Sequence, residues 1–143
     1  MQLIEKAWAK VCGSYEATEM GTAAEAFNNI DGTPCQTFFM QEVQDRNEEE
    51  KLWNLLKEAD EKRYVSTCSI DSNVRCNPEQ LKEFGLCDFH SYTILKCLEV
   101  NLFPKGNKVR YLMQLRNPWG KKEWLGPWSD YSSCWEKYPY AHE

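Results

Sequence analysis

The chain has 143 residues, of which 42% are hydrophobic, 13% aromatic and 27% charged, a composition typical of a soluble globular protein of one domain. Its net charge of −5 arises from scattered acidic residues, and no basic stripe accompanies the aromatic residues, which argues against nucleic acid as a partner. No stretch approaches the roughly eighteen consecutive apolar residues of a membrane span, and charges interrupt the apolar N-terminus. We therefore expect neither a membrane span nor a signal peptide.

The cysteines indicate the compartment. There are 7 of them, an odd number, and no CxxC pair occurs among them. This usage is typical of reduced thiols in a cytosolic protein, and structural zinc is the less favoured alternative. We predict a cytoplasmic location.

Three stretches carry helical patterns. Apolar residues recur at helical spacing over residues 2–11, and Gly13 then ends the predicted helix. Thr22 predicts the N-cap of a short helix over residues 22–30, because a glutamate follows three positions later. Residues 46–62 combine an apolar stripe with acidic residues in the first turn and basic residues at the end, and both charge placements suit the helix dipole.

Strand patterns dominate the second half of the chain. Residues 64–70 have strand propensity and lead into a polar loop over residues 71–80. Two longer strand-like stretches follow at 91–100 and 108–116, and the connection between them contains proline and glycine, so we predict an antiparallel hairpin. The second of these strands alternates apolar and polar residues, with Leu112 as an apolar exception on the outer face.

The hairpin brings together two residues that could share a chemical task. If its loop centres near Pro104, His90 lies nearly opposite Asn117. The asparagine carbonyl can then accept a hydrogen bond from one imidazole nitrogen while the other nitrogen faces a cysteine thiol, and Trp119 is placed to shield that bond from water. On spacing alone, a structural histidine and an Asn-Pro turn remain the commoner alternative.

Several sequence motifs of the chain resemble those of a known family. FHSYTILK (89–96) and LRNPWGKKEWLGPWSD (115–130) closely resemble the second half of the protease core of the calpain family, where histidine opens a strand and asparagine lies in R-N-P-W-G. LIEKAWAKVCGSYEA (3–17) and TCSI (67–70) extend the resemblance over essentially the whole chain. It implies an α+β fold in which N-terminal helices pack on an antiparallel sheet. Residues 1–143 would form the second subdomain of a papain-like cysteine protease, one wall of its cleft.

The same resemblance implies roles for particular residues. His90 matches the catalytic histidine, Asn117 the asparagine that orients it, and Trp119 the tryptophan that shields both. The implied activity is peptide-bond hydrolysis by a Cys-His-Asn triad, with proteins or peptides as substrates. Trp124 and Trp128 are expected to anchor the segment to the sheet as ordinary aromatic core.

Calcium is the cofactor that the resemblance implies. Glu123 and Asp130 fall where the family places calcium ligands. Calcium takes about six to eight oxygen ligands, so two side chains give an incomplete site, and the adjacent Lys121 and Lys122 would weaken it by charge repulsion. Apart from the resemblance, these two acids are interpreted as solvated surface residues.

Two features depart from the family pattern. The nucleophilic cysteine, followed by tryptophan, belongs to a helical half that precedes this one in the family, and none of the cysteines here has that context. Cys134 precedes a tryptophan but follows Asn117, which is the wrong chain order. Phe89 replaces the glycine that the family usually has before the histidine, and we expect it to crowd the cleft.

Two functions follow from these observations. In the first, the chain is the His/Asn wall of a calcium-dependent cysteine endopeptidase, inactive alone and partnered by a cysteine-bearing first half of the core. In the second, it is a non-catalytic calpain-like module that serves as a binding or structural component of a larger assembly. The presence of a second domain that carries a Cys-Trp nucleophile would favour the first function.

Overall fold

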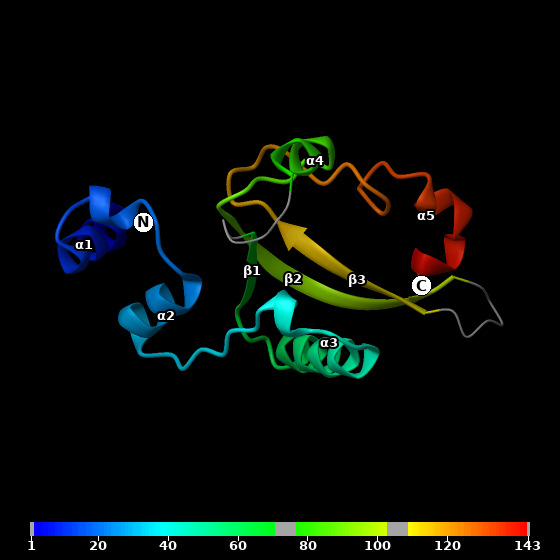
Figure 1. The fold of residues 1–143 in the computed structure, drawn as a ribbon, viewed down its shortest axis with the longest axis horizontal. Helices are drawn as coiled ribbons and strands as arrows, with labels where there is room; N and C mark the ends of the chain where they lie inside the picture. The colour runs from blue at the N-terminus through cyan, green and yellow to red at the C-terminus, as the bar shows by residue number, and fades with distance from the viewer. Residues whose placement is uncertain (1, 71–76, 103–108, 143) are drawn as a thin grey trace. The chain divides into compact units, whose positions relative to one another are not determined.

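The structure, a computed structural model, describes residues 2–70, 77–102 and 109–142. The chain divides into two compact units, Met1–Val43 and Gln44–Glu143 (Figure 1). The combination of helices with an antiparallel sheet confirms the predicted α+β class.

The first unit contains the two N-terminal helices, α1 (Gln2–Cys12) and α2 (Ala23–Asp31). Gly13 follows α1 at φ 99°, a conformation in which glycine avoids the steric cost of a Cβ atom. The Thr22 hydroxyl accepts a hydrogen bond from the Glu25 backbone N–H, so the predicted N-cap is confirmed. Short 3₁₀ turns lie at Glu16–Thr18 (η1) and Met40–Glu42 (η2).

Helix α1 forms without burying the stripe that predicted it. Ala9 is buried, but Leu3, Ile4 and Val11 are all exposed. The helical period of the sequence therefore identified the element correctly, although Leu3, Ile4 and Val11 of its apolar side chains stay exposed.

The second unit begins with helix α3 (Arg46–Glu61), close to the predicted bounds. The Asp45 side chain accepts hydrogen bonds from the backbone N–H groups of Asn47 and Glu48, which satisfies two donors that the first turn leaves free. Glu48 and Glu49 lie in that first turn, where the positive end of the helix dipole favours their charge.

A three-stranded antiparallel sheet in the order β1-β2-β3 lies beside α3 (Figure 1). Its strands are β1 (Ser66–Ile70), β2 (His90–Asn101) and β3 (Val109–Arg116). The predicted hairpin is confirmed: Thr93 pairs with Arg116 and Cys97 with Met113, within about two residues of the predicted register. The connecting loop lies outside the described residues. A register shift between Ile94 and Lys96 marks a bulge in β2.

One helix in this unit was missed. Part of the predicted polar loop forms α4 (Pro78–Glu83), while residues 71–76 lie outside the described part of the chain. The Asn77 side chain accepts a hydrogen bond from the Glu79 backbone N–H, and Pro78 occupies the first turn. Asn followed by Pro and Glu is a helix start signal, so the loop prediction was wrong for residues 78–80, where this signal was not considered.

Helix α3 packs on the sheet through an aromatic contact. The buried Trp53 ring stacks on Tyr111 of β3 with ring centroids 4.6 Å apart. Its indole Nε1 donates a hydrogen bond of 2.9 Å to Glu99 of β2, and Lys57 forms an ion pair with the same carboxylate at 3.0 Å. One residue of each strand of the hairpin is thus joined to one helix.

The Glu99 contacts make this packing pH-dependent. The Trp53 indole, and then the Lys57 ammonium, lower the pKa of the Glu99 carboxyl from its ordinary 4.5. The carboxylate therefore stabilises the fold above the ordinary pKa, and this contribution is lost as the pH falls through the lowered value. We expect Glu99→Gln to lower the free energy of unfolding at pH 7 by at most about 1 kcal/mol, because the side chain is 40% exposed and solvent screens it.

Urea denaturation at several pH values measures this effect. The deficit of the Glu99→Gln variant should shrink as the pH is lowered below about 4, whereas Glu50→Gln, an exposed change on α3, should leave stability unaltered. A deficit that stays constant from pH 7 to pH 3 would show that the ionised carboxylate does not contribute.

The C-terminal segment ends in α5 (Cys134–Lys137) and the 3₁₀ turn η3 (Pro139–His142), and η3 contacts β2. The Trp128 ring packs edge-on against Trp135 and stacks on Tyr138, with centroids 4.9 and 5.8 Å apart. No helix within the described residues is both long and apolar enough to cross a membrane.

Candidate active site

His90 and Asn117 meet at the open end of the hairpin, where β2 begins and β3 ends. His90 opens β2, and Asn117 follows the last residue of β3. The distance between His90 Nε2 and Asn117 Oδ1 is 2.8 Å, a hydrogen bond, and each residue is only 6% exposed. The predicted encounter of these two side chains is therefore present, and it is shielded from water.

The surrounding backbone fixes the orientation of the Asn117 amide. Its Nδ2 donates to the carbonyl oxygens of Lys121 and Lys122 at 2.7 and 3.1 Å, and its Oδ1 accepts from the Trp119 backbone N–H at 3.0 Å. An amide that donates to two carbonyls on one side must present its oxygen on the other. His90 Nε2 therefore carries the proton of this bond.

The other imidazole nitrogen is available for chemistry. Among the described residues Nδ1 of His90 has no hydrogen-bond partner, and no side-chain nitrogen or oxygen there is both buried and unpartnered. Nδ1 is therefore the ring nitrogen that the described contacts leave unpartnered. With Nε2 protonated, Nδ1 of the neutral ring carries the lone pair and can accept a proton.

Trp119 covers the histidine. The two ring centroids are 4.0 Å apart, with the planes tilted by 43°. The indole is 57% exposed, so it contacts His90 on one side and solvent on the other. An apolar ring in this place limits the access of water to the imidazole–amide bond, which strengthens it.

Tyr92 supports the histidine from a second direction, and the sequence interpretation missed it. The Tyr92 ring lies edge-on to the His90 ring at 4.8 Å, and its hydroxyl accepts a hydrogen bond from the Cys87 backbone N–H at 2.9 Å. Burial raises the pKa of this hydroxyl, so it stays protonated. The signal was present, because residues two apart on a strand share a face.

The segment after Trp119 is held by Phe84, the residue that caps the C-terminus of α4. The Leu125 backbone N–H donates to the Phe84 carbonyl at 2.9 Å, and the Trp124 ring stacks on Phe84 with centroids 5.3 Å apart. The expectation that both tryptophans anchor to the sheet is not met by their described ring contacts: Trp124 stacks on Phe84, and Trp128 contacts rings of the C-terminal segment. The partners of both rings are set by the tertiary structure and were not indicated by the sequence pattern.

Within the described residues, Glu123 and Asp130 do not join a cluster of metal-ligating side chains. Both side chains are exposed, and the described residues contain no group of three or more His, Cys, Asp or Glu side chains that could hold a metal ion. Calcium needs about six to eight oxygen ligands. The residues present therefore do not fit a resident calcium ion by themselves.

None of the described cysteines forms a thiol–imidazole contact with His90 in the structure. The described hydrogen bond and ring contacts of the imidazole are with Asn117, Trp119 and Tyr92, and none of them involves one of the six described free cysteines. Cys134, the residue in the wrong chain order, begins α5. Burial raises the pKa of the Cys68 thiol, which opposes formation of the reactive thiolate.

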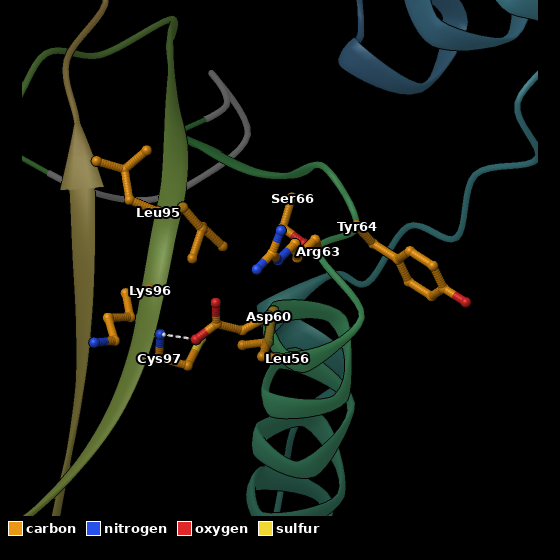
Figure 2. A pocket seen from close by; sticks show the side chains of 9 residues that line it. Leu56, Asp60, Arg63, Tyr64, Ser66, Leu95, Lys96 and Cys97 are labelled. Carbon is orange, nitrogen blue, oxygen red and sulfur yellow. Dashed lines mark hydrogen bonds between the residues drawn. The ribbon is translucent and has the colours of Figure 1, made fainter.

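Cys97 lines a cavity of about 150 Å³ between the end of α3 and the bulge of β2 (Figure 2). Its backbone N–H donates to the Asp60 carboxylate at 2.9 Å. Burial, and then the negative charge of Asp60, raise the pKa of its thiol. None of the residues around His90 lines this cavity, so it is separate from the candidate active site.

Phe89 adopts a backbone conformation that suits glycine. Its φ is 48°, and the side chain is 56% exposed. A side chain in the left-handed region costs about 1 kcal/mol, because Cβ approaches the following carbonyl. This explains physically why a glycine is the expected residue before the histidine.

We expect Phe89→Gly to be more stable than Phe89→Ala by about 1 kcal/mol, since both remove the exposed ring and only glycine relieves the strain. Urea denaturation of the two variants measures the difference. Equal stabilities would mean that the backbone at this position relaxes out of the left-handed region when the ring is absent.

Comparisons with known proteins agree on one assignment. A model of the calpain family of cysteine proteases matches residues 1–142. Calpain-14 of Homo sapiens is 38% identical over 134 residues, which cover 94% of this chain and 18% of that protein. Calpain-9 of Mus musculus is 38% identical over 133 residues, with 93% and 18% covered. The calpain-1 catalytic subunit of Bos taurus is 36% identical over 142 residues, with 99% and 19% covered.

These matches place the chain in the class of cysteine proteases. Within that class it belongs to the calpain family, which confirms the resemblance carried by its motifs. The chain spans about a fifth of the length of the curated relatives it matches.

Proposed function

We propose that this chain supplies the histidine and asparagine wall of a cysteine endopeptidase. The observation that carries the proposal is the buried bond between His90 Nε2 and Asn117 Oδ1, which leaves Nδ1 without a partner among the described residues. Asn117 sets the tautomer, Trp119 shields the bond, and the open nitrogen is the one that a thiol would approach. The substrates of such a wall are proteins or peptides.

In the proposed mechanism a thiol from a cysteine-bearing wall gives its proton to His90 Nδ1. The resulting thiolate attacks the scissile carbonyl, and the imidazolium then returns the proton to the leaving amine as the peptide bond breaks. Water hydrolyses the thioester, with His90 as the base, and restores the thiol. This chain alone is expected to be inactive, because a general base without a nucleophile has nothing to activate.

Calcium has no step in this mechanism. Glu123 and Asp130 supply too few oxygens for a site, so calcium dependence of a complete protease would need further ligands from other parts of the protein. A reducing compartment such as the cytosol is the location that suits a thiol protease, and the six described cysteines are unpaired.

The alternative is a non-catalytic calpain-like module, and Phe89 is the observation that favours it. An exposed ring sits directly before His90, at a position with glycine-like φ. If the ring blocks the approach of a substrate, the His90–Asn117 geometry is retained but does not take part in catalysis.

A chimera tests the two functions. The 143 residues replace the matching segment of Mus musculus calpain-9, and cleavage of a casein substrate is compared with that of the unaltered calpain. Activity that a thiol alkylator abolishes supports the proposed wall. A chimera that unfolds cooperatively like its parent but cleaves nothing contradicts it, and recovery on adding Phe89→Gly would assign the block to that ring.

A further inference from the structure

Strand β3 forms an open edge of the sheet. It pairs with β2 on one side, and within the described ranges no other strand or backbone hydrogen bond reaches it (Figure 1). Each described side chain from Arg110 to Arg116 is exposed except Leu112, which is half-buried. An edge of this length offers a row of free N–H and C=O groups on which a further strand can pair.

The two faces of this edge differ in chemistry. Arg110, Leu112, Gln114 and Arg116 alternate with Tyr111, Met113 and Leu115, so the arginines share one face and the larger apolar side chains the other. Tyr111 is fixed by its stacking on Trp53. The edge therefore presents two positive charges on one face and an apolar row on the other.

The charge of the edge indicates its partner. Arg110 and Arg116 are exposed, and neither forms an ion pair with any described residue. Unpaired positive charge at both ends of one strand, in a chain of net charge −5, favours an acidic ligand. A second copy of the chain is disfavoured, because antiparallel pairing about Met113 would place Arg110 opposite Arg116 of the other copy.

We propose that the β3 edge binds an extended acidic segment of another protein as a fourth strand. Backbone hydrogen bonds to β3 give the affinity, acidic side chains of the ligand face Arg110 and Arg116, and its alternate apolar side chains lie along Met113 and Leu115. The interaction needs no thiol and no substrate turnover, so it goes beyond the proposed function and stands apart from it.

Binding of synthetic peptides to the full-length protein tests the proposal. The probe is a fluorescein-labelled peptide of alternating glutamate and valine, followed by fluorescence anisotropy. A second peptide of the same charge, with proline in place of valine, lacks the backbone N–H at every second residue, and its fixed prolines disfavour strand pairing. We expect saturable binding of the first peptide only, weakened by salt.

Variants locate the site. The double variant Arg110→Glu with Arg116→Glu should weaken binding about tenfold or more, since two attractions become repulsions. Arg63→Glu with Lys82→Glu makes the same change of net charge at exposed positions outside β3, and it should bind as the parent does. Hydrogen exchange should show that β3 amides which are unprotected in the free protein become protected by the peptide.

Three results would overturn the proposal: equal binding of the proline peptide, equal weakening by the two double variants, or no saturable binding of the glutamate–valine peptide. Protection of all β3 amides in the free full-length protein would overturn it as well, because the edge would then already be paired.

Discussion

Replacing Asn117 with alanine is expected to lower kcat of the calpain-9 chimera by about 10²-fold or more, because the imidazole loses the acceptor that sets its tautomer. In the structure Asn117 Oδ1 lies 2.8 Å from His90 Nε2, and no other described group takes that place. Without it, Nε2 and Nδ1 compete for the proton, and the ring is free to turn beneath Trp119. The measurement is kcat and KM for a fluorogenic peptide across a range of pH.

The same substitution removes the two bonds that Asn117 Nδ2 donates to backbone carbonyls, which costs about 1–3 kcal/mol of stability. Activity must therefore be measured well below the unfolding temperature of the variant. Gln80→Ala, which removes an exposed amide from α4, is the matched control and should change neither quantity. Unchanged kcat in a folded Asn117→Ala chimera would remove Asn117 from the mechanism.

The second large effect is expected at Gly85, where alanine should lower the free energy of unfolding by about 2–4 kcal/mol. Gly85 ends α4 at φ 74°, and an added Cβ would lie 1.9 Å from the Glu123 carbonyl oxygen. Backbone has to move to relieve such an overlap. The segment that moves carries the carbonyls bonded to Asn117, so the site should loosen together with the fold.

Gly120→Ala separates the conformational cost of a left-handed φ from the cost of the steric overlap. Gly120 has φ 65°, close to that of Gly85, but no heavy atom lies within 4 Å of its added Cβ. This variant should lose only the conformational part, about 1 kcal/mol. Urea denaturation of both variants gives the comparison, and equal losses would mean that the approach of Gly85 to Glu123 does not constrain the fold.

Two local signals and one distant contact account for what the sequence interpretation missed. Helix α4 was overlooked because its N-cap, Asn77, is also a common turn residue. Trp124 was assigned to the sheet because apolar residues were assumed to join one core, whereas its ring lies on Phe84. Tyr92 was not considered, although its place two residues after His90 put it on the same face.

The sequence by itself determined the helices α1, α2 and α3, the β2–β3 hairpin with its register, the meeting of His90 and Asn117, and the calpain family. These depend on local periodicity, caps and a short connection, whose physical causes act over a few residues. Only the tertiary structure decided the orientation of the Asn117 amide, the approach of Gly85 to Glu123, the left-handed φ of Phe89 and the open edge of β3. The approach of Gly85 to Glu123 joins segments that are distant in the chain. The other features depend on the backbone path of turns and on which strands pair, and neither the caps nor the periodicity of the sequence specifies these.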